Sequence, residues 1–155
     1  MANAFQQNLP GTAHLNKFDS SKTPIALQRP APSLTAGAAS APWRVILYIG
    51  TETITPIRLE VSGTAIIGRG DPAENYVPGV DLSPFGAQDA GVSRRHAAFL
   101  SSADGLYIRD MDSTNGTTVN GFPIMANQPY KLRDGDRLQL GQMHLTLQIA
   151  AAPGQ

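Results

Sequence analysis

The chain has 155 residues, a formal net charge of zero from 12 basic and 12 acidic side chains, and no cysteine. A chain of this length can bury a core without covalent cross-links. Its balanced charge gives no electrostatic reason to bind nucleic acid or an anionic membrane, and the lack of cysteine excludes disulfides, thiolate metal sites and a cysteine nucleophile. The longest aliphatic run, residues 45–49, is far shorter than the ~20 residues that span a bilayer, and the N-terminus lacks a signal-peptide pattern. We therefore expect a soluble, cytoplasmic protein.

Residues 1–41 differ from the rest of the chain in composition. They are rich in Ala, Pro, Ser, Thr, Asn and Gln, and their apolar residues follow no period. Such a segment buries too little apolar surface to offset the entropy lost on ordering. We predict a flexible tail over residues 1–41, one domain over residues 42–150 and a disordered C-terminus over residues 151–155.

From Trp43 onward the sequence consists of short β-type runs separated by turns. The predicted strands cover residues 43–49, 54–61, 65–67, 96–100, 106–110, 118–119, 124–125, 130–132, 137–140 and 143–149. The last run alternates strictly between apolar and polar residues, as a half-buried strand does. No segment of helical length carries an apolar stripe of period 3.6. The pattern predicts an all-β, antiparallel sandwich or barrel.

Four short stretches at predicted strand ends carry the functional signal. They are Gly68-Arg69, residues 93–96 (Ser-Arg-Arg-His), residues 113–117 (Ser-Thr-Asn-Gly-Thr) and Asn120-Gly121. Together they offer a guanidinium, two hydroxyls, loop N–H groups and a side-chain amide. Arginine presents a planar fork of donors to phosphate oxygens, and hydroxyls and loop N–H groups can complete the shell. The set is suited to holding a phosphate and the peptide that carries it.

The combination and order of these stretches resemble the forkhead-associated (FHA) domain, a family of phosphothreonine-peptide binders. The resemblance covers residues 43–149. It implies an antiparallel two-sheet β-sandwich with its binding loops at one end. It also implies a non-catalytic module without a cofactor, which recognises phosphothreonine in partner proteins of Ser/Thr kinase signalling.

The resemblance assigns a role to each matching position. Arg69 and Ser93 are expected to bind phosphate, with Arg94 and Thr114 assisting, and Asn115 to hold the main chain of the peptide. Structural support of the binding loops is expected from Gly68, His96, Gly116, Asn120 and Gly121. His96 is expected to be buried and hydrogen-bonded, whereas Arg95 fits a surface position equally well.

Two other functional classes use the same residues. A phosphate-independent scaffold or oligomerisation domain on the same fold would have no need of Arg69, Ser93 and Asn115 together. A hydrolase would use Ser93 and His96, but no glycine-flanked elbow surrounds the serine and no acid is evident. We therefore expect no enzymatic activity. His14 and His144 have no partner at ligand spacing, and no metal site is predicted.

The segment between Gly70 and Val92 is longer than in many FHA domains and contains four acidic residues but no Lys or Arg. These are Asp71, Glu74, Asp81 and Asp89. Close to the phosphate site, their carboxylates would oppose an anionic ligand and favour ligands with basic flanking residues.

The predicted tail contains threonines that could themselves become ligands. Thr12 and Thr23 lie on a segment expected to be extended, and Pro24 follows Thr23. A phosphate there would be tethered to its own pocket at high effective concentration. The expected partners are therefore a phosphothreonine-containing protein and, in a regulatory role, the phosphorylated tail of the chain itself.

Overall fold

The computed structural model describes residues 42–50 and 54–152. The predicted tail over residues 1–41 lies outside the described residues, as do residues 153–155 of the predicted C-terminal segment. The described part is all-β, with two single-turn 3-10 helices, η2 (Pro72–Glu74) and η3 (Ser83–Phe85). No helix in it is long and apolar enough to cross a membrane. The strands are β2 (Trp43–Ile49), β3 (Thr55–Val61), β4 (Thr64–Gly68), β5 (Val80–Asp81), β6 (Ala97–Ser102), β7 (Gly105–Asp110), β8 (Thr117–Val119), β9 (Phe122–Pro123), β10 (Pro129–Lys131), β11 (Arg137–Leu140) and β12 (Met143–Ala151).

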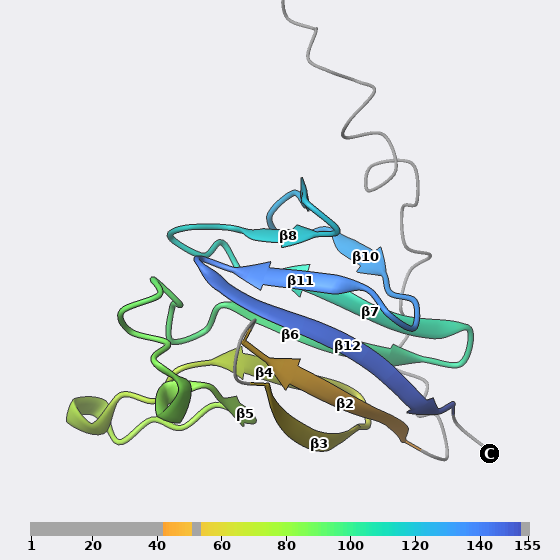
Figure 1. Cartoon of the computed structure of the whole chain (residues 1–155), viewed down its shortest axis with the longest axis horizontal. Coiled ribbons are helices and arrows are strands. Elements are labelled where there is room, and N and C mark those ends of the chain that lie inside the picture. Colours follow the sequence, from red (N-terminus) through yellow and green to blue (C-terminus); the bar gives the residue numbers. More distant parts are fainter. Residues whose placement is uncertain (1–41, 51–53, 153–155) are drawn as a thin grey trace, which may run out of the picture.

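The strands form two sheets that pack face to face (Figure 1). One has five strands in the order β10-β7-β6-β4-β5, and the other has six in the order β3-β2-β12-β11-β8-β9. The predicted all-β, two-sheet sandwich is confirmed. One pair departs from the antiparallel pattern, because β5 runs parallel to β4.

Period-2 patterning explains how the two sheets form one core. Along β12 every second side chain is buried, so that Leu145 and Leu147 face the opposite sheet while the intervening polar residues face solvent. Leu47 of β2 and Phe99 of β6 are also fully buried in this core. Each fully buried large aliphatic or aromatic side chain contributes about 1.5–3 kcal/mol, so the strands are held mainly by this shared apolar layer.

Three local features of the structure differ from the predictions. Residues 124–125 were expected to form a strand opposite residues 118–119, but β9 consists of Phe122–Pro123. The two-residue Asn120-Gly121 turn pairs Val119 with Phe122. Only Thr117 of β8 is then left for the expected strand, and its carbonyl accepts a hydrogen bond from the Ile124 N–H (3.0 Å). Strand β5 was not predicted, since two residues are too short to show a period. Strand β12 also continues to Ala151, one residue beyond the predicted end of the domain.

The register brings the predicted loops to one end of the sandwich. In the five-stranded sheet Ile67 lies opposite Ala97, and Ala97 lies opposite Asp110. In the six-stranded sheet Leu140 lies opposite Thr117. The segments that leave these strands, residues 69–96, 111–116 and 141–142, therefore meet at the same end, on the left of Figure 1.

Candidate functional site

The end of β4 is joined tightly to the segment that carries Ser93. The Arg69 N–H donates to Ser93 O (3.3 Å), and Arg69 Nε donates to Val92 O (2.8 Å). Gly68 is buried against the same segment, where an added Cβ would collide with Arg94 O and lie 2.7 Å from Ser93 O. Only glycine allows this close approach. Within the described residues Arg69 Nη1 and Nη2 take part in no hydrogen bond, so the outer edge of its guanidinium is available.

His96 ties two of the loops together from inside the protein. Its side chain is fully buried, its Nδ1 accepts a hydrogen bond from the Ser93 N–H (3.0 Å), and its Nε2 lies 2.9 Å from Gly116 O. Because Nδ1 is an acceptor, the proton is assigned to Nε2, which donates to the Gly116 carbonyl. Burial lowers the pKa of His96 and outweighs the opposing effects of the Gly116 carbonyl and the Asp110 charge. The imidazole is therefore neutral at pH 7.

Asp110 holds the 113–117 loop, a role that the sequence analysis did not assign. Its buried carboxylate accepts hydrogen bonds from the Ser113 hydroxyl (2.6 Å), the Ser113 N–H (3.0 Å) and the Thr117 hydroxyl (2.6 Å). The Gly116 N–H in turn donates to Ser113 Oγ (2.9 Å). An acidic residue at an inward-facing strand end, followed three residues later by serine, is the sequence signal that could have indicated this capping role.

Asn120 is held by a second buried carboxylate. Its Nδ2 donates to Asp136 Oδ1 (2.9 Å), and its Oδ1 accepts from the Arg137 N–H (2.9 Å). These bonds fix the Asn120-Gly121 hairpin against β11. They lie at the opposite end of β8 from the 113–117 loop, and no hydrogen bond from the Asn120 side chain to that loop occurs among the described residues.

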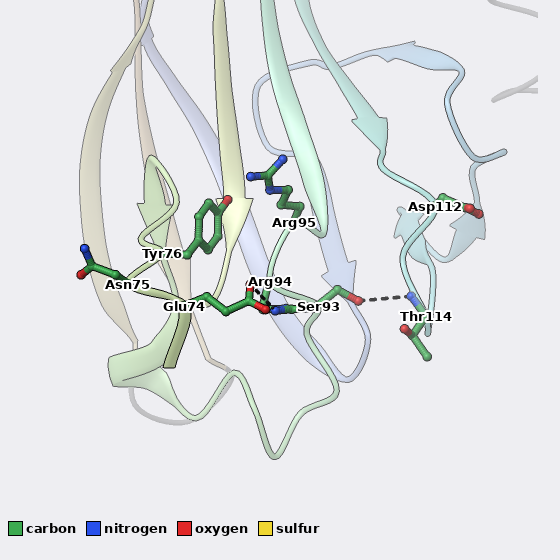
Figure 2. Close-up of a pocket in the computed structure, with 8 residues that line it drawn as sticks. All are labelled: Glu74, Asn75, Tyr76, Ser93, Arg94, Arg95, Asp112 and Thr114. Atoms are coloured by element: carbon green, nitrogen blue, oxygen red, sulfur yellow. Dashed lines mark hydrogen bonds and ion pairs between the residues drawn. The ribbon is translucent and has the colours of Figure 1, made fainter. Parts of the chain in front are cut away.

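The loops enclose a pocket of about 500 Å³, shown in Figure 2 with its lining residues. Of the residues predicted to contact the ligand, Ser93, Arg94 and Thr114 line it together. Ser93 Oγ accepts a hydrogen bond from the Thr114 N–H (3.2 Å), which leaves the serine O–H able to donate to a ligand. Arg69 and Asn115 do not line this pocket.

Asn115 instead connects two loops. Its Nδ2 donates to Gly91 O (2.9 Å), and a Cβ added to Gly91 would lie 2.5 Å from this nitrogen. Gly91 also has φ +78°, a conformation that other residues adopt only with strain. One of the two amide N–H groups of Asn115 is therefore used within the chain. The other N–H and Oδ1, which accepts no hydrogen bond from the described residues, can pair with the main chain of a peptide.

The acidic segment between Gly70 and Val92 contacts the site through ion pairs with Arg94. Arg94 Nη1 lies 2.8 Å from Asp71 Oδ2 and 2.9 Å from Glu74 Oε1. The hydrogen bond that Arg94 donates to Asp71, followed by the charge of Glu74, raises the pKa of Arg94. Desolvation acts to raise the pKa of Asp71, but the hydrogen bonds from Arg94 and the Ala73 N–H outweigh it and leave that pKa below its ordinary value.

The other two acidic residues of this segment are not part of the Arg94 ion pairs. Asp81 Oδ1 accepts the N–H groups of Gly70 and Ser83 and so shapes the segment itself, while Asp89 is exposed. No group of three or more metal-ligating side chains occurs in the part of the chain that the structure describes.

The chain is a two-sheet β-sandwich with a pocket formed by the loops at one end. Comparison with known proteins identifies its family. Residues 65–141 match the model of the FHA domain. The chain belongs to this family. It is 38% identical over 78 residues to the protein FraH of Nostoc sp. and 37% identical over 87 residues to the FHA domain-containing protein FhaA of Mycobacterium tuberculosis. These matches cover 50% and 56% of this chain, but only 27% and 14% of the two relatives.

Solved FHA domains are similar to this chain over about two thirds of its length. One, studied for phosphothreonine-dependent FHA domain interactions, has 31% identity and a TM-score of 0.54, and the match covers 70% of this chain and 98% of that one. The FhaA FHA domain, solved in complex with the intracellular domain of another protein, has 33% identity and a TM-score of 0.52, with coverage of 67% and 99%.

Proposed function

We propose that residues 42–150 form a non-catalytic module that binds phosphothreonine in partner proteins of Ser/Thr kinase signalling. The observation that carries the proposal is the common pocket of Ser93, Arg94 and Thr114, with Arg69 fixed behind the Ser93 loop. The phosphothreonine-dependent interactions studied for a similar FHA domain support it. The proposal includes a cytoplasmic location, where ATP is available for the phosphorylation of such partners.

The geometry suggests how each group would act on the phosphate. The Ser93 hydroxyl donates to a phosphate oxygen while its lone pair keeps the bond from the Thr114 N–H. The free Nη edge of Arg69 offers two parallel donors, which is the arrangement that binds phosphate most strongly. Arg94 uses only Nη1 for its ion pairs, so its Nη2 can turn to the ligand. The exposed Thr114 hydroxyl adds a neutral donor.

The arrangement of Ser93 and His96 favours binding over hydrolysis. Nδ1 of the imidazole bonds the backbone N–H of Ser93 and Nε2 faces the Gly116 carbonyl, so neither ring nitrogen is available to the serine hydroxyl. A serine nucleophile needs a base within hydrogen-bond reach of its Oγ. The proposal therefore assigns His96 to loop support.

The test is a fluorescence titration of the full-length chain with a degenerate phosphothreonine peptide library, beside the same library without phosphate and with phosphoserine. We expect binding only with phosphate, tighter for phosphothreonine. Ser93→Ala removes one hydrogen bond to a charged group, worth about 1.5–3 kcal/mol, and should weaken binding at least about tenfold. Thr146→Ala, on the exposed face of β12, is the control. Equal affinity for the phosphothreonine library and the library without phosphate contradicts the proposal and favours the scaffold alternative. No binding by a folded chain also contradicts the proposal.

A further inference from the structure

The pocket contains two neighbouring arginines in different electrostatic situations. Arg94 is paired with two carboxylates through Nη1. Arg95 lines the same pocket, but it forms no ion pair with any described carboxylate. Its guanidinium carbon lies 4.9 Å from the centroid of the Tyr76 ring. Figure 2 shows both side chains in the pocket. Arg95 is therefore a positioned cation of the pocket without an acidic partner in the described part of the chain.

The long segment after β4 places Tyr76 where it can hold Arg95. Asp71 and Tyr76 exchange backbone hydrogen bonds, with Asp71 N–H to Tyr76 O at 2.8 Å and Tyr76 N–H to Asp71 O at 2.9 Å. This small closed loop also carries Glu74 to Arg94. The hydroxyl of Tyr76 is buried and has no hydrogen-bond partner among the described residues. The ring therefore acts on Arg95 through its face, as cation–π contacts do.

The charges on the pocket wall show what Arg95 is suited to bind. Glu74 and Asp112 are the acidic residues that line the pocket. Glu74 is already paired with Arg94, and Figure 2 shows Asp112 on the far side, beside Thr114. A guanidinium that is oriented by an aromatic face and lacks a carboxylate is a ready partner for a planar anion. A peptide that delivers phosphate to Ser93 brings its neighbouring side chains to this wall.

We propose that Arg95 is a second anion-binding residue of the pocket, which recognises an acidic side chain or a second phosphorylated residue close in sequence to the phosphothreonine. This inference rests on the proposed function. It reverses the sequence expectation of basic flanking residues, because Asp71 and Glu74 are already paired with Arg94, whereas Arg95 forms no ion pair among the described residues. Tyr76 is a positioning residue that acts through Arg95.

The experiment compares affinities of the full-length chain for one phosphothreonine peptide in a matched series. Glu, Gln or phosphoserine is placed in turn at each of the three positions on either side of the phosphothreonine. At one position we expect Glu to bind about twofold to fivefold more tightly than Gln, as for a solvent-exposed ion pair. A larger gain with phosphoserine than with Glu identifies a second phosphate as the preferred anion, and the opposite order identifies a carboxylate.

Variants decide whether Arg95 is responsible. Arg95→Gln should abolish the advantage of the anionic peptide while retaining binding of the Gln peptide. Tyr76→Leu should reduce the advantage, whereas Tyr76→Phe, which keeps the ring and removes only the unpartnered hydroxyl, should preserve it. Equal affinity for all three peptides at every position, or an advantage that survives in Arg95→Gln, overturns the inference. If the unmodified chain instead bound the peptide equally well with phosphorylated and with unphosphorylated threonine, the proposed function would be overturned.

Discussion

The backbone N–H of Ser93 donates to Nδ1 of the buried His96 across 3.0 Å, so the position of the candidate phosphate-binding serine depends on the protonation state of the histidine. A proton on Nδ1 would set two N–H groups against each other and break this bond. The structure thus couples the pH of the solution to the loop that carries Ser93.

The first prediction concerns how the free energy of unfolding depends on pH. The pKa of His96 is lowered in the folded protein, so the unfolded chain binds more protons between the folded pKa and the ordinary value of about 6.5. The contribution of His96 to stability is therefore complete above about pH 6.5 and is lost as the pH falls through the folded pKa. Urea unfolding at a series of pH values should show this decline.

Two histidine variants separate this effect from other acid effects. His96→Gln should be less stable at neutral pH and should lose this part of the pH dependence. His144→Gln, at an exposed position on β12, should keep the wild-type profile. An unchanged profile in His96→Gln would show that the buried imidazole is not the titrating group.

The second prediction concerns Asp110. Asp110→Ala leaves the Ser113 and Thr117 donors without their acceptor in a buried site. Each unsatisfied buried donor costs about 1–3 kcal/mol, so we expect a loss of several kcal/mol in the free energy of unfolding, together with weaker phosphopeptide binding. Asp89→Ala, at an exposed position, serves as the control. The idea fails if chemical denaturation gives the two variants the same stability.

The third prediction concerns the close approach at Gly68. Gly68→Ala should force Ser93 and Arg94 away from the end of β4, at a cost of about 1–3 kcal/mol as in other overpacked sites, and should weaken ligand binding. Gly79→Ala is the matched control, because an added Cβ there meets nothing closer than Ile66 O at 3.4 Å. Thermal unfolding and peptide titration of both variants are the measurements. Wild-type behaviour of Gly68→Ala would disprove the steric argument.

The fourth prediction concerns Arg69. Arg69→Ala should lower phosphopeptide affinity at least about tenfold, because it removes a bidentate charged donor. It should also cost a little stability, since Arg69 Nε holds Val92 O. Arg69→Lys keeps the charge without the planar fork and should restore only part of the affinity. Calorimetric titration with one phosphothreonine peptide gives the comparison, with the exposed Arg133→Ala as control. Normal binding by Arg69→Ala would exclude Arg69 from the site.

The strands of this fold could be predicted because their patterning is local. Residues 143–149 alternate strictly, and the Asn120-Gly121 pair specifies a two-residue hairpin on its own. Strand β5 could not be predicted, because it is defined only by its parallel pairing with β4. Residues 124–125 were misplaced since the length of β8, and not the composition of the segment, decides where pairing ends.

In the candidate site, too, features that depend on local sequence could be predicted, and contacts between distant segments could not. The gathering of Ser93 and Thr114 follows from motifs at strand ends, and these were visible in the sequence. The ion pairs of Arg94 and the stacking of Arg95 on Tyr76 join residues about 20 positions apart through an irregular segment. Such contacts leave no periodic pattern of apolar and polar residues in the sequence. The Asp110 network was missed for a different reason, since no role was assigned to this carboxylate although Ser113 follows it by three residues.

The described residues bury four polar or charged side chains, and three of them, His96, Asp110 and Thr117, lie directly behind the binding loops. Their hydrogen bonds set the conformation of residues 93–96 and 113–117 before any ligand arrives. The conformational entropy of these loops is therefore lost during folding and not during association. A peptide meeting this surface has only its own backbone to order, so a small number of well-placed contacts is enough for specific recognition.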